Sequence, residues 1–376
     1  MNVRAAVLRH SGLPHPYTES HPLVIETINL GVPQRGEVLV RVLAAGLCHS
    51  DLSVINGTRL RPLPMVLGHE AAGEVLEMGE ETEGLGVGDR VVFSFVPSCG
   101  YCEPCATGRP ALCESGAASN AAGELLKAAR RWTDHDGNVL HHHLGVSAFA
   151  EYVVVSARSV VKIDPELPPE IAALFGCAVL TGVGAVVNTA KVTPGQSVAI
   201  FGLGGVGLSA LLGARCSGAY PIIAVDVNQE RLALALTIGA HYACNARDTN
   251  LVEAVREHSH GGVHYAIESV GNEIVLAQAY AVTRRGGETI GVGLPAPDKR
   301  LSIPAVSLVA EERTIRGSYM GSAVPSRDLP RFIALYRAGL LPIERLLTHR
   351  LHLHELNEGF DRLARGEAIR QVVLFD

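Results

Sequence analysis

The sequence is poor in several residue types, and each shortage excludes something. Only 5% of its 376 residues are aromatic, and 19% are charged, with a formal net charge of −6. It has 28 Arg and 4 Lys but no basic block of the kind that binds nucleic acid or anionic membranes. We also expect no uncharged apolar run of the roughly 18–20 residues that span a bilayer. The predicted partners therefore include neither nucleic acid nor membrane.

The first ten residues, MNVRAAVLRH, alternate as a short strand does and lack the apolar core of a signal peptide. This predicts a cytoplasmic protein. Clustered cysteines in that compartment are metal ligands or redox groups more often than disulfides. The chain has eight cysteines, 40 glycines and 47% apolar residues, enough for two domains with sizeable cores.

The pattern of residues changes near residue 178. Before it lie short β-rich segments broken by Gly and Pro, which favour antiparallel, barrel-like packing. After it, six apolar strand candidates between residues 197 and 321 alternate with helical patterns, which predicts a doubly wound parallel sheet. We predict one domain over residues 1–178 and 322–376 and a second over 179–321. Residues 114–145 are expected to form an irregular insertion.

A glycine-rich turn predicts a dinucleotide site in the second domain. The stretch GLGGVG fits G-x-G-x-x-G, follows the strand SVAIF and opens a helix, where free N–H groups favour a pyrophosphate. Asp226 ends the next strand, 19 residues after Gly207, where a carboxylate accepts hydrogen bonds from ribose hydroxyls and disfavours NADP. Arg231 could weaken that preference for NAD. The predicted turn consists of Gly202, Gly204, Gly205, Val206 and Gly207.

Four cysteines lie within fifteen residues, with the spacing C-x2-C-x2-C-x7-C. Cys99, Cys102, Cys105 and Cys113 can wrap one zinc ion, whereas a ferredoxin run requires C-x3-C-P at its end. A redox dithiol is the alternative, but it leaves two cysteines unexplained. Four thiolates on Zn²⁺ give a formal −2 and no open coordination position. The predicted site therefore stabilises structure and does no chemistry.

A second candidate set is scattered along the chain. Cys48, His69 and Cys177 would give a near-neutral site with an open fourth position, as catalytic zinc requires. These residues are 21 and 108 positions apart, so spacing alone does not separate a zinc site from two packing cysteines and a turn histidine.

Six motifs in one order over nearly the whole chain decide between these alternatives. They are GHEAAGEV, the four-cysteine lobe, HHHLGVSAFAEY, FGCAVLTGVGAVVNTAKV, GLGGVG and IRQVVLF. The chain resembles the zinc-containing medium-chain alcohol dehydrogenases, in particular their long branch of liver-type and glutathione-dependent formaldehyde dehydrogenases. The resemblance implies a GroES-like catalytic domain with a zinc lobe at about residues 97–115, and a Rossmann domain.

The resemblance also implies site roles. Cys48, His69 and Cys177 become the catalytic zinc ligands, and the lobe becomes the structural zinc site, with two Zn²⁺ per chain. Asp51 is expected to orient the ligand histidine, and Glu70 to lie behind the metal. Ser50 is expected to take the alcohol proton. Contacts to NAD are implied for His49 and Arg370, at the pyrophosphate, and for Val292, at the nicotinamide amide.

One position departs from the liver-type pattern. Ser53 stands where a histidine ends the proton relay, and serine cannot store a proton near pH 7. Release is then expected through water or another histidine. Residues expected to line the substrate pocket are Phe95 and Leu144, which are apolar, and Arg59 and His143, which bring polarity to its outer part.

The expected activity is reversible hydride transfer between a primary or secondary alcohol and NAD, giving an aldehyde or ketone, in a homodimer. The first alternative is a formaldehyde dehydrogenase acting on a glutathione or mycothiol adduct. Its carboxylate-binding arginine is absent from ESGAASNAAG, although Arg130 and Arg131 follow. A zinc-free enone reductase and a non-catalytic NAD(H)-binding protein are the remaining alternatives. Cys216 and Cys244 are expected to be packing residues.

Overall fold

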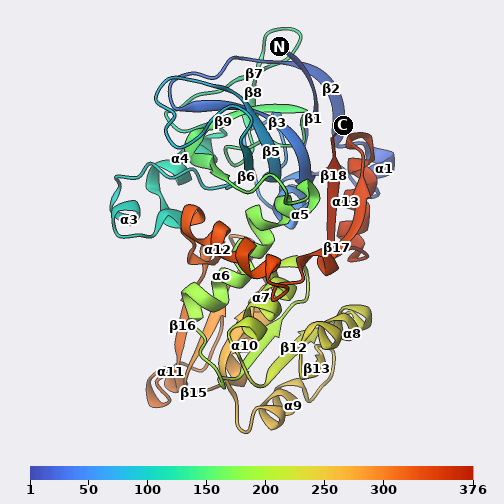
Figure 1. Ribbon diagram of the computed structural model, residues 1–376. Helices are drawn as coiled ribbons and strands as arrows, with labels where there is room; N and C mark the ends of the chain where they lie inside the picture. Colours follow the sequence, from blue (N-terminus) through green and yellow to red (C-terminus); the bar gives the residue numbers. More distant parts are fainter. Residues whose placement is uncertain (376) are drawn as a thin grey trace. The chain divides into compact units, whose positions relative to one another are not determined.

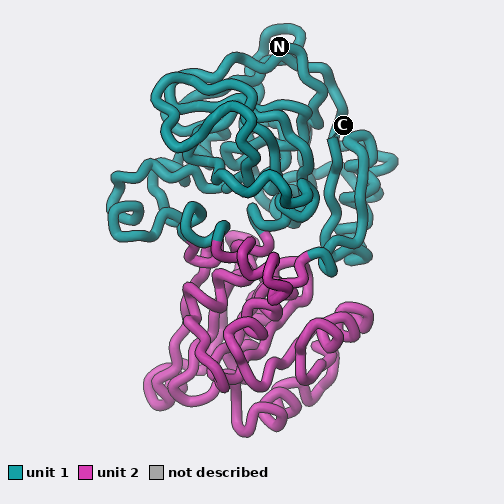
Figure 2. Tube along the Cα trace, viewed as in Figure 1, with its two compact units in different colours: residues 1–177, 324–330, 344–376 teal, residues 178–323, 331–343 magenta. Residues whose placement is uncertain are grey.

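The computed structural model describes residues 1–375 and divides the chain into two compact units (Figure 2). Unit 1 comprises Met1–Cys177, Val324–Pro330 and Glu344–Asp376, and unit 2 comprises Ala178–Ala323 and Arg331–Ile343. Of the predicted segment 322–376, residues 322–323 and 331–343 therefore cluster with unit 2.

Unit 1 is built from two β systems around one apolar core (Figure 1), and their strands pair antiparallel except for β4 with β8 and β17 with β18. A closed barrel has the strand order β1-β2-β7-β8-β4, and a seven-stranded sheet has the order β10-β6-β5-β3-β18-β17, with β9 paired to β3. The strands are β1 Asn2–Leu8, β2 Leu23–Leu30, β3 Glu37–Gly46, β4 Met65–Val66, β5 Glu70–Met78, β6 Arg90–Phe93, β7 Trp132–Thr133, β8 Val139–His142, β9 Tyr152–Ser156, β10 Val160–Lys162, β17 Leu347–Leu351 and β18 Arg370–Leu374.

The register between β3 and β5 determines which residues meet at one end of the sheet. The strands are antiparallel, and Gly46, the last residue of β3, pairs with Glu70, the first residue of β5. A Cβ at Gly46 would lie 2.8 Å from the Glu70 carboxylate, so only glycine leaves room for that side chain. Cys48 lies two residues after β3 and His69 lies just before β5, so this register brings them to the same end of the sheet.

The helices of unit 1 are short, and one corrects a sequence expectation. They are α1 Tyr17–Ser20, α2 His49–Ile55, α3 Glu103–Ala106, α4 Glu114–Ala122, α5 Pro169–Leu174 and α13 Leu356–Arg365, with 3-10 turns at Pro110–Leu112, Ala157–Ser159, Ile343–Leu346 (which begins in unit 2) and Leu353–Glu355. Residues 114–145 are not irregular throughout, because they form α4, β7 and β8. The Cys113 sulfur caps α4 by accepting a hydrogen bond from Gly116 N.

Unit 2 carries the predicted six-stranded parallel sheet, in the order β13-β12-β11-β14-β15-β16. Helices α7 to α10 pack on its strands (Figure 1). The strands are β11 Val198–Phe201, β12 Ile222–Asp226, β13 Tyr242–Asn245, β14 Val263–Glu268, β15 Thr283–Gly291 and β16 Thr314–Gly317. The helices are α6 Leu180–Gly184, α7 Gly205–Cys216, α8 Gln229–Ile238, α9 Leu251–His258, α10 Glu273–Val282 and α11 Ala305–Ala310, with a 3-10 turn at Tyr319–Ser322; α12 Pro325–Arg337 belongs partly to each unit.

A continuous helix over Pro169–Ala190 contradicts the expectation that no apolar run is long enough to span a bilayer. By length and composition it could cross a membrane, but 83% of its most apolar window is buried inside the protein. Two π-helical stretches interrupt its α-helical geometry, Phe175–Val179 and Ala185–Ala190. Such π segments recur at functional sites, and the first contains Cys177.

Candidate active site

Three predicted zinc ligands converge in the buried end of unit 1. Cys48 is the N-cap residue of α2, His69 lies just before β5, and Cys177 lies in the first π-helical stretch. Their ligand atoms, with a carboxylate oxygen of Glu70, all lie within 4.8 Å of one another, and all four residues are buried. The fold therefore assembles the set that spacing could not establish.

The donor geometry fits a zinc ion. Four ligands at about 2.3 Å in a tetrahedron place two sulfurs roughly 3.8 Å apart, and the Sγ atoms of Cys48 and Cys177 are 4.0 Å apart. His69 Nε2 is buried and has no hydrogen-bond partner among the described residues, as expected for a nitrogen kept for a metal. A hydrogen bond between the two sulfurs lowers the pKa of Cys48 well below its usual value and raises that of Cys177.

Asp51 holds the other nitrogen of the histidine ligand. Its Oδ1 lies 3.1 Å from His69 Nδ1 and accepts a hydrogen bond of 3.2 Å from Gly68 N. Gly68 has φ +93° and packs closely on Phe149. A Cβ at Gly68 would lie 2.5 Å from the backbone nitrogen of Phe149. Burial favours a neutral imidazole, yet the Asp51 charge raises the pKa of His69 well above its ordinary value. The expected orienting role of Asp51 agrees with this geometry.

Glu70 and Arg370 form a buried pair beside the sulfurs. Arg370 Nη1 lies 3.4 Å from Glu70 Oε2 and donates to Leu47 O at 3.2 Å, and the two side chains are 5% and 0% exposed. Burial raises the pKa of Glu70 to about 7, against the opposing effect of Arg370. The pair belongs to unit 1; a contact of Arg370 with the cofactor stays a prediction.

The predicted proton-handling residues lie on the first turns of α2. Ser50 is half-buried and His49 is exposed. The Ser53 hydroxyl donates to Ser50 O at 2.8 Å, so its proton is committed to the helix backbone. This bond occupies the Ser53 hydroxyl, and a serine does not titrate near pH 7 as a histidine does.

The four-cysteine lobe is a second, separate cluster in unit 1. All four sulfurs lie within 4.8 Å of one another, and those of Cys102 and Cys113 are 3.9 Å apart. Backbone N–H groups of Cys99, Cys102 and Gly116 donate to cysteine sulfurs at 3.2–3.3 Å, which stabilises thiolates. Against the effect of burial, backbone donors lower the pKa of Cys99 to about 6. The four sulfurs and the N–H groups around them fit a site that holds one zinc ion.

The glycine-rich turn in unit 2 has the geometry that a pyrophosphate site needs. Gly202 has φ +87°, and a Cβ at Gly207 would lie 1.7 Å from Gly202 O. Space around Gly204, by contrast, is open, so a ligand can approach the backbone there. Asp226 Oδ2 accepts a hydrogen bond of 2.6 Å from Leu203 N and so borders the turn.

Two other predicted cofactor residues also lie in unit 2. Arg231 lies in the first turn of α8, and its backbone N donates to Asn228 Oδ1 at 3.2 Å. Val292 follows β15 and donates to Glu268 O at 2.8 Å. Their contacts with NAD stay predictions.

The four residues predicted for the substrate pocket differ in their surroundings. Phe95 is 8% exposed and contacts the His69 ring edge-on at 5.5 Å, and Leu144 is 7% exposed. Arg59 is half-buried on the loop after α2. His143 is 1% exposed and lies beside Asp51 and His69, a position that its predicted place in the outer pocket did not suggest.

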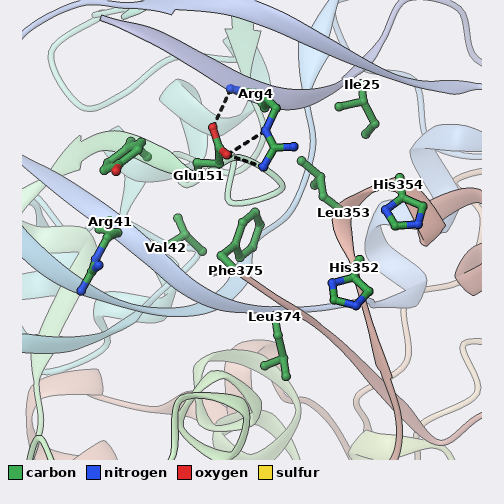
Figure 3. A pocket seen from close by; sticks show the side chains of 11 residues that line it. Arg4, Ile25, Arg41, Val42, Glu151, His352, Leu353, His354, Leu374 and Phe375 are labelled. Atoms are coloured by element: carbon green, nitrogen blue, oxygen red, sulfur yellow. Dashed lines mark hydrogen bonds and ion pairs between the residues drawn. The ribbon is translucent and has the colours of Figure 1, made fainter.

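Unit 1 also has a hollow of about 340 Å³ away from these residues (Figure 3). The residues that line it include Arg4, His352, His354 and Phe375. Arg4 forms an ion pair with Glu151, which also lines the hollow. None of the predicted site residues is among its lining residues. The hollow is therefore not the candidate active site.

Comparison with known proteins gives the family. Residues 34–165 match the alcohol dehydrogenase GroES-like domain, and residues 205–338 match the zinc-binding dehydrogenase family. Geraniol dehydrogenase from Castellaniella defragrans is 38% identical over 100% of this chain and 98% of its own length. This chain belongs to the zinc-containing medium-chain alcohol dehydrogenases.

Solved structures agree over the whole length of this alcohol dehydrogenase. An alcohol dehydrogenase zinc-binding domain protein from Burkholderia ambifaria has TM-score 0.94 and 37% identity, covering 100% of this chain and 99% of its own. Benzyl alcohol dehydrogenase from Acinetobacter calcoaceticus has TM-score 0.91 and 33% identity, covering 100% of both chains. The predicted fold, a GroES-like domain with a Rossmann domain, is confirmed.

The same comparisons favour the alcohol dehydrogenase prediction over the thiol-adduct alternative. The structure gives an independent reason. Arg131 makes a two-pronged ion pair with Glu37 at 2.7 and 2.9 Å, and Arg130 pairs with Glu124 at 2.7 Å. Both arginines that could have held the carboxylate of an adduct are thus engaged with carboxylates of the chain itself.

Proposed function

We propose that this alcohol dehydrogenase uses two zinc ions per chain and NAD to oxidise primary alcohols with an apolar allylic or aromatic group. The observation that supports this most is the convergence of Cys48, His69 and Cys177, with His69 Nε2 buried and without a hydrogen-bond partner among the described residues. The relatives named geraniol and benzyl alcohol dehydrogenase support the substrate class, and Phe95 beside His69 supplies an aromatic wall. We further propose a cytoplasmic homodimer.

The protein's own groups account for positioning and proton handling. Cys48, His69 and Cys177 would hold the zinc ion, whose positive charge would lower the pKa of an alcohol hydroxyl. Asp51 keeps His69 Nδ1 protonated, so that Nε2 is the free nitrogen. Ser50 Oγ accepts the hydroxyl proton and passes it to water, because Ser53 Oγ already donates to Ser50 O.

On unit 2, the turn from Gly202 to Gly207 is proposed to bind the pyrophosphate through backbone N–H groups at the start of α7. Asp226 is proposed to accept hydrogen bonds from the ribose hydroxyls. A carboxylate beside a 2′-phosphate costs several kcal/mol, so we expect NAD to be preferred over NADP by at least about 100-fold in kcat/KM.

The experiment is an initial-rate panel on the purified protein with measured zinc content. Geraniol, benzyl alcohol, ethanol and formaldehyde are each assayed with NAD and NADP, and formaldehyde also with glutathione and with mycothiol. We expect geraniol and benzyl alcohol to exceed ethanol in kcat/KM, with NAD preferred. Turnover of formaldehyde only in the presence of a thiol, or full activity in a verified zinc-free sample, would contradict the proposal.

A further inference from the structure

The buried carboxylate of Asp51 lies close to three nitrogen atoms, of which only one belongs to the predicted zinc ligand His69. Asp51 is 0% exposed, and its Oδ1 lies 3.2 Å from Gly68 N, 3.1 Å from His69 Nδ1 and 3.0 Å from His143 Nδ1. Its Oδ2 is buried without a hydrogen-bond partner among the described residues. A buried charge is costly unless donors surround it. The position of Asp51 therefore depends on the groups that face Oδ1.

His143 is fixed in this position from both its backbone and its ring. It follows β8, and its backbone N donates to Ser147 Oγ at 2.9 Å. Its ring meets that of His69 edge-on, with centroids 5.5 Å apart and an interplanar angle of 87°. Among the described residues, Nδ1 makes no hydrogen bond of standard geometry, so its 3.0 Å approach to Oδ1 is a contact between the ring dipole and a charge.

The His69 ring lies between two edge-on neighbours, Phe95 at 5.5 Å and His143 at 5.5 Å. Phe95 offers only carbon, whereas His143 also reaches the carboxylate that holds His69. Partners behind a ligating histidine fix its tautomer and ring orientation, and losing one typically weakens metal binding about 10–100-fold. A carbon-only side chain at position 143 would remove this contact and leave Oδ1 facing two nitrogen atoms, Gly68 N and His69 Nδ1.

We infer that His143 is a positioning residue for the zinc ligand His69, acting through Asp51. The inference rests on the proposed function, because it requires zinc at Cys48, His69 and Cys177. It concerns this chain's particular residue at position 143 and adds a third member to the Asp51–His69 pair. It ascribes no proton transfer to His143.

The test measures the zinc dissociation constant of the assembled site by competition with a chelator, in His143→Phe and His143→Asn. Phenylalanine keeps the ring volume without a polar atom, and the asparagine amide places a polar N–H group near the position of Nδ1. We expect the Phe variant to bind that zinc about 10–100-fold more weakly and the Asn variant to recover most of the loss. Zinc in the four-cysteine lobe, retained by both variants, is the internal control for folding. If the Phe variant does not fold, His143→Leu replaces it.

A double-variant cycle separates positioning from packing. If His143 acts through Asp51, then adding His143→Phe to Asp51→Asn changes the dissociation constant by less than about twofold. Equal losses in the Phe and Asn variants, unchanged zinc binding in both, or full additivity with Asp51→Asn would overturn the inference. Failure of the proposed function shows differently, because the unmodified protein would then hold zinc only in the lobe.

Discussion

The two cysteine clusters of this dehydrogenase are built in opposite ways. The lobe takes four sulfurs from fifteen consecutive residues, and Cys102 and Cys105 are only half-buried. The assembled site takes two sulfurs and one imidazole from residues up to 129 positions apart, all buried. Four thiolates saturate a zinc ion, whereas three ligands leave one position open. The number of ligands therefore distinguishes the proposed structural site from the proposed catalytic one, and the second site is the more deeply buried of the two.

The largest expected effect comes from removing one sulfur of the assembled site. Cys48→Ala should lower kcat/KM by at least about 1,000-fold, because zinc stabilises developing charge by several kcal/mol. Zinc content should fall from two ions per chain to one, while NADH still binds in a fluorescence titration. The control is Cys244→Ala, a buried cysteine of β13 outside both clusters, which should keep both ions. Retained activity in the Cys48 variant would remove the distinction between the clusters.

Removing the hydroxyl of Ser50, the proposed proton acceptor, should have the next largest effect. Ser50→Ala should lower kcat by about 100-fold or more with zinc content unchanged, because positioned proton transfer contributes 10²–10⁴-fold. Ser50→Thr keeps a hydroxyl and should retain most activity. Steady-state kinetics with metal analysis checks both variants, and an Ala variant as active as the Thr variant would show that Ser50 carries no proton.

Asp51→Asn tests the support behind the metal. The amide presents an N–H or a weaker acceptor to His69 Nδ1, so activity and zinc affinity should both fall about 10–100-fold. Chelator-release kinetics should show faster loss of the assembled-site zinc and unchanged loss of the lobe zinc. Equal acceleration at both sites would indicate general unfolding.

Removing a cysteine of the lobe should lower the stability of the protein more than its catalytic activity. Cys105→Ala should lose the lobe zinc and lower the thermal unfolding midpoint, since a structural zinc contributes folding free energy directly. The activity of the folded fraction, assayed at low temperature, should change by about threefold or less. That change corresponds to about 0.6 kcal/mol of activation free energy. Cys216→Ala, a half-buried cysteine outside the lobe, is the matched control. A Cys105 variant with normal stability and no activity would reverse the two roles.

Acid should lower the free energy of unfolding through His142, a buried histidine at the end of β8. Burial lowers the pKa of His142 to about 3, and its Nε2 accepts a hydrogen bond from Arg131 N at 3.0 Å. The folded state therefore binds fewer protons than the unfolded state below pH 6.5. This contribution is complete above about pH 6.5 and falls by up to about 1.4 kcal/mol per pH unit as the pH drops toward 3. The lobe, residues 97–115, contains no histidine.

The check is denaturant unfolding of His142→Gln at several pH values. Glutamine keeps an acceptor and does not titrate, so the free energy of unfolding should depend less steeply on pH between 6 and 4 than in the unmodified protein. An identical pH dependence would show that His142 is not the responsible group.

Local sequence patterns were enough to predict that the four cysteines of the lobe lie together, and to predict the glycine-rich turn and the six parallel strands. Their residues are neighbours in sequence, so spacing encodes geometry. The assembled site could not be read in this way, because it depends on the pairing of Gly46 with Glu70 and on a π-helical stretch at Cys177. Resemblance to the family supplied what spacing lacked.

Two expectations failed for physical reasons. Helix α4 is rich in small residues, and its apolar side chains show no clear helical period, so residues 114–145 looked irregular. In the apolar run of Pro169–Ala190, glycines separate the larger apolar side chains. Gly182 is one of them: a Cβ there would lie 2.2 Å from Val206 O, so it permits the close approach of α7. The burial of His143 beside Asp51 also follows only from the fold.

The most direct test of two unlike zinc sites is zinc X-ray absorption spectroscopy on the unmodified protein, with the zinc content measured on the same sample. Four sulfurs in the lobe and two in the assembled site predict two zinc ions per chain and an average of three sulfurs per zinc, at about 2.3 Å. One zinc ion per chain with four sulfurs would contradict the account, because only the lobe would then hold metal.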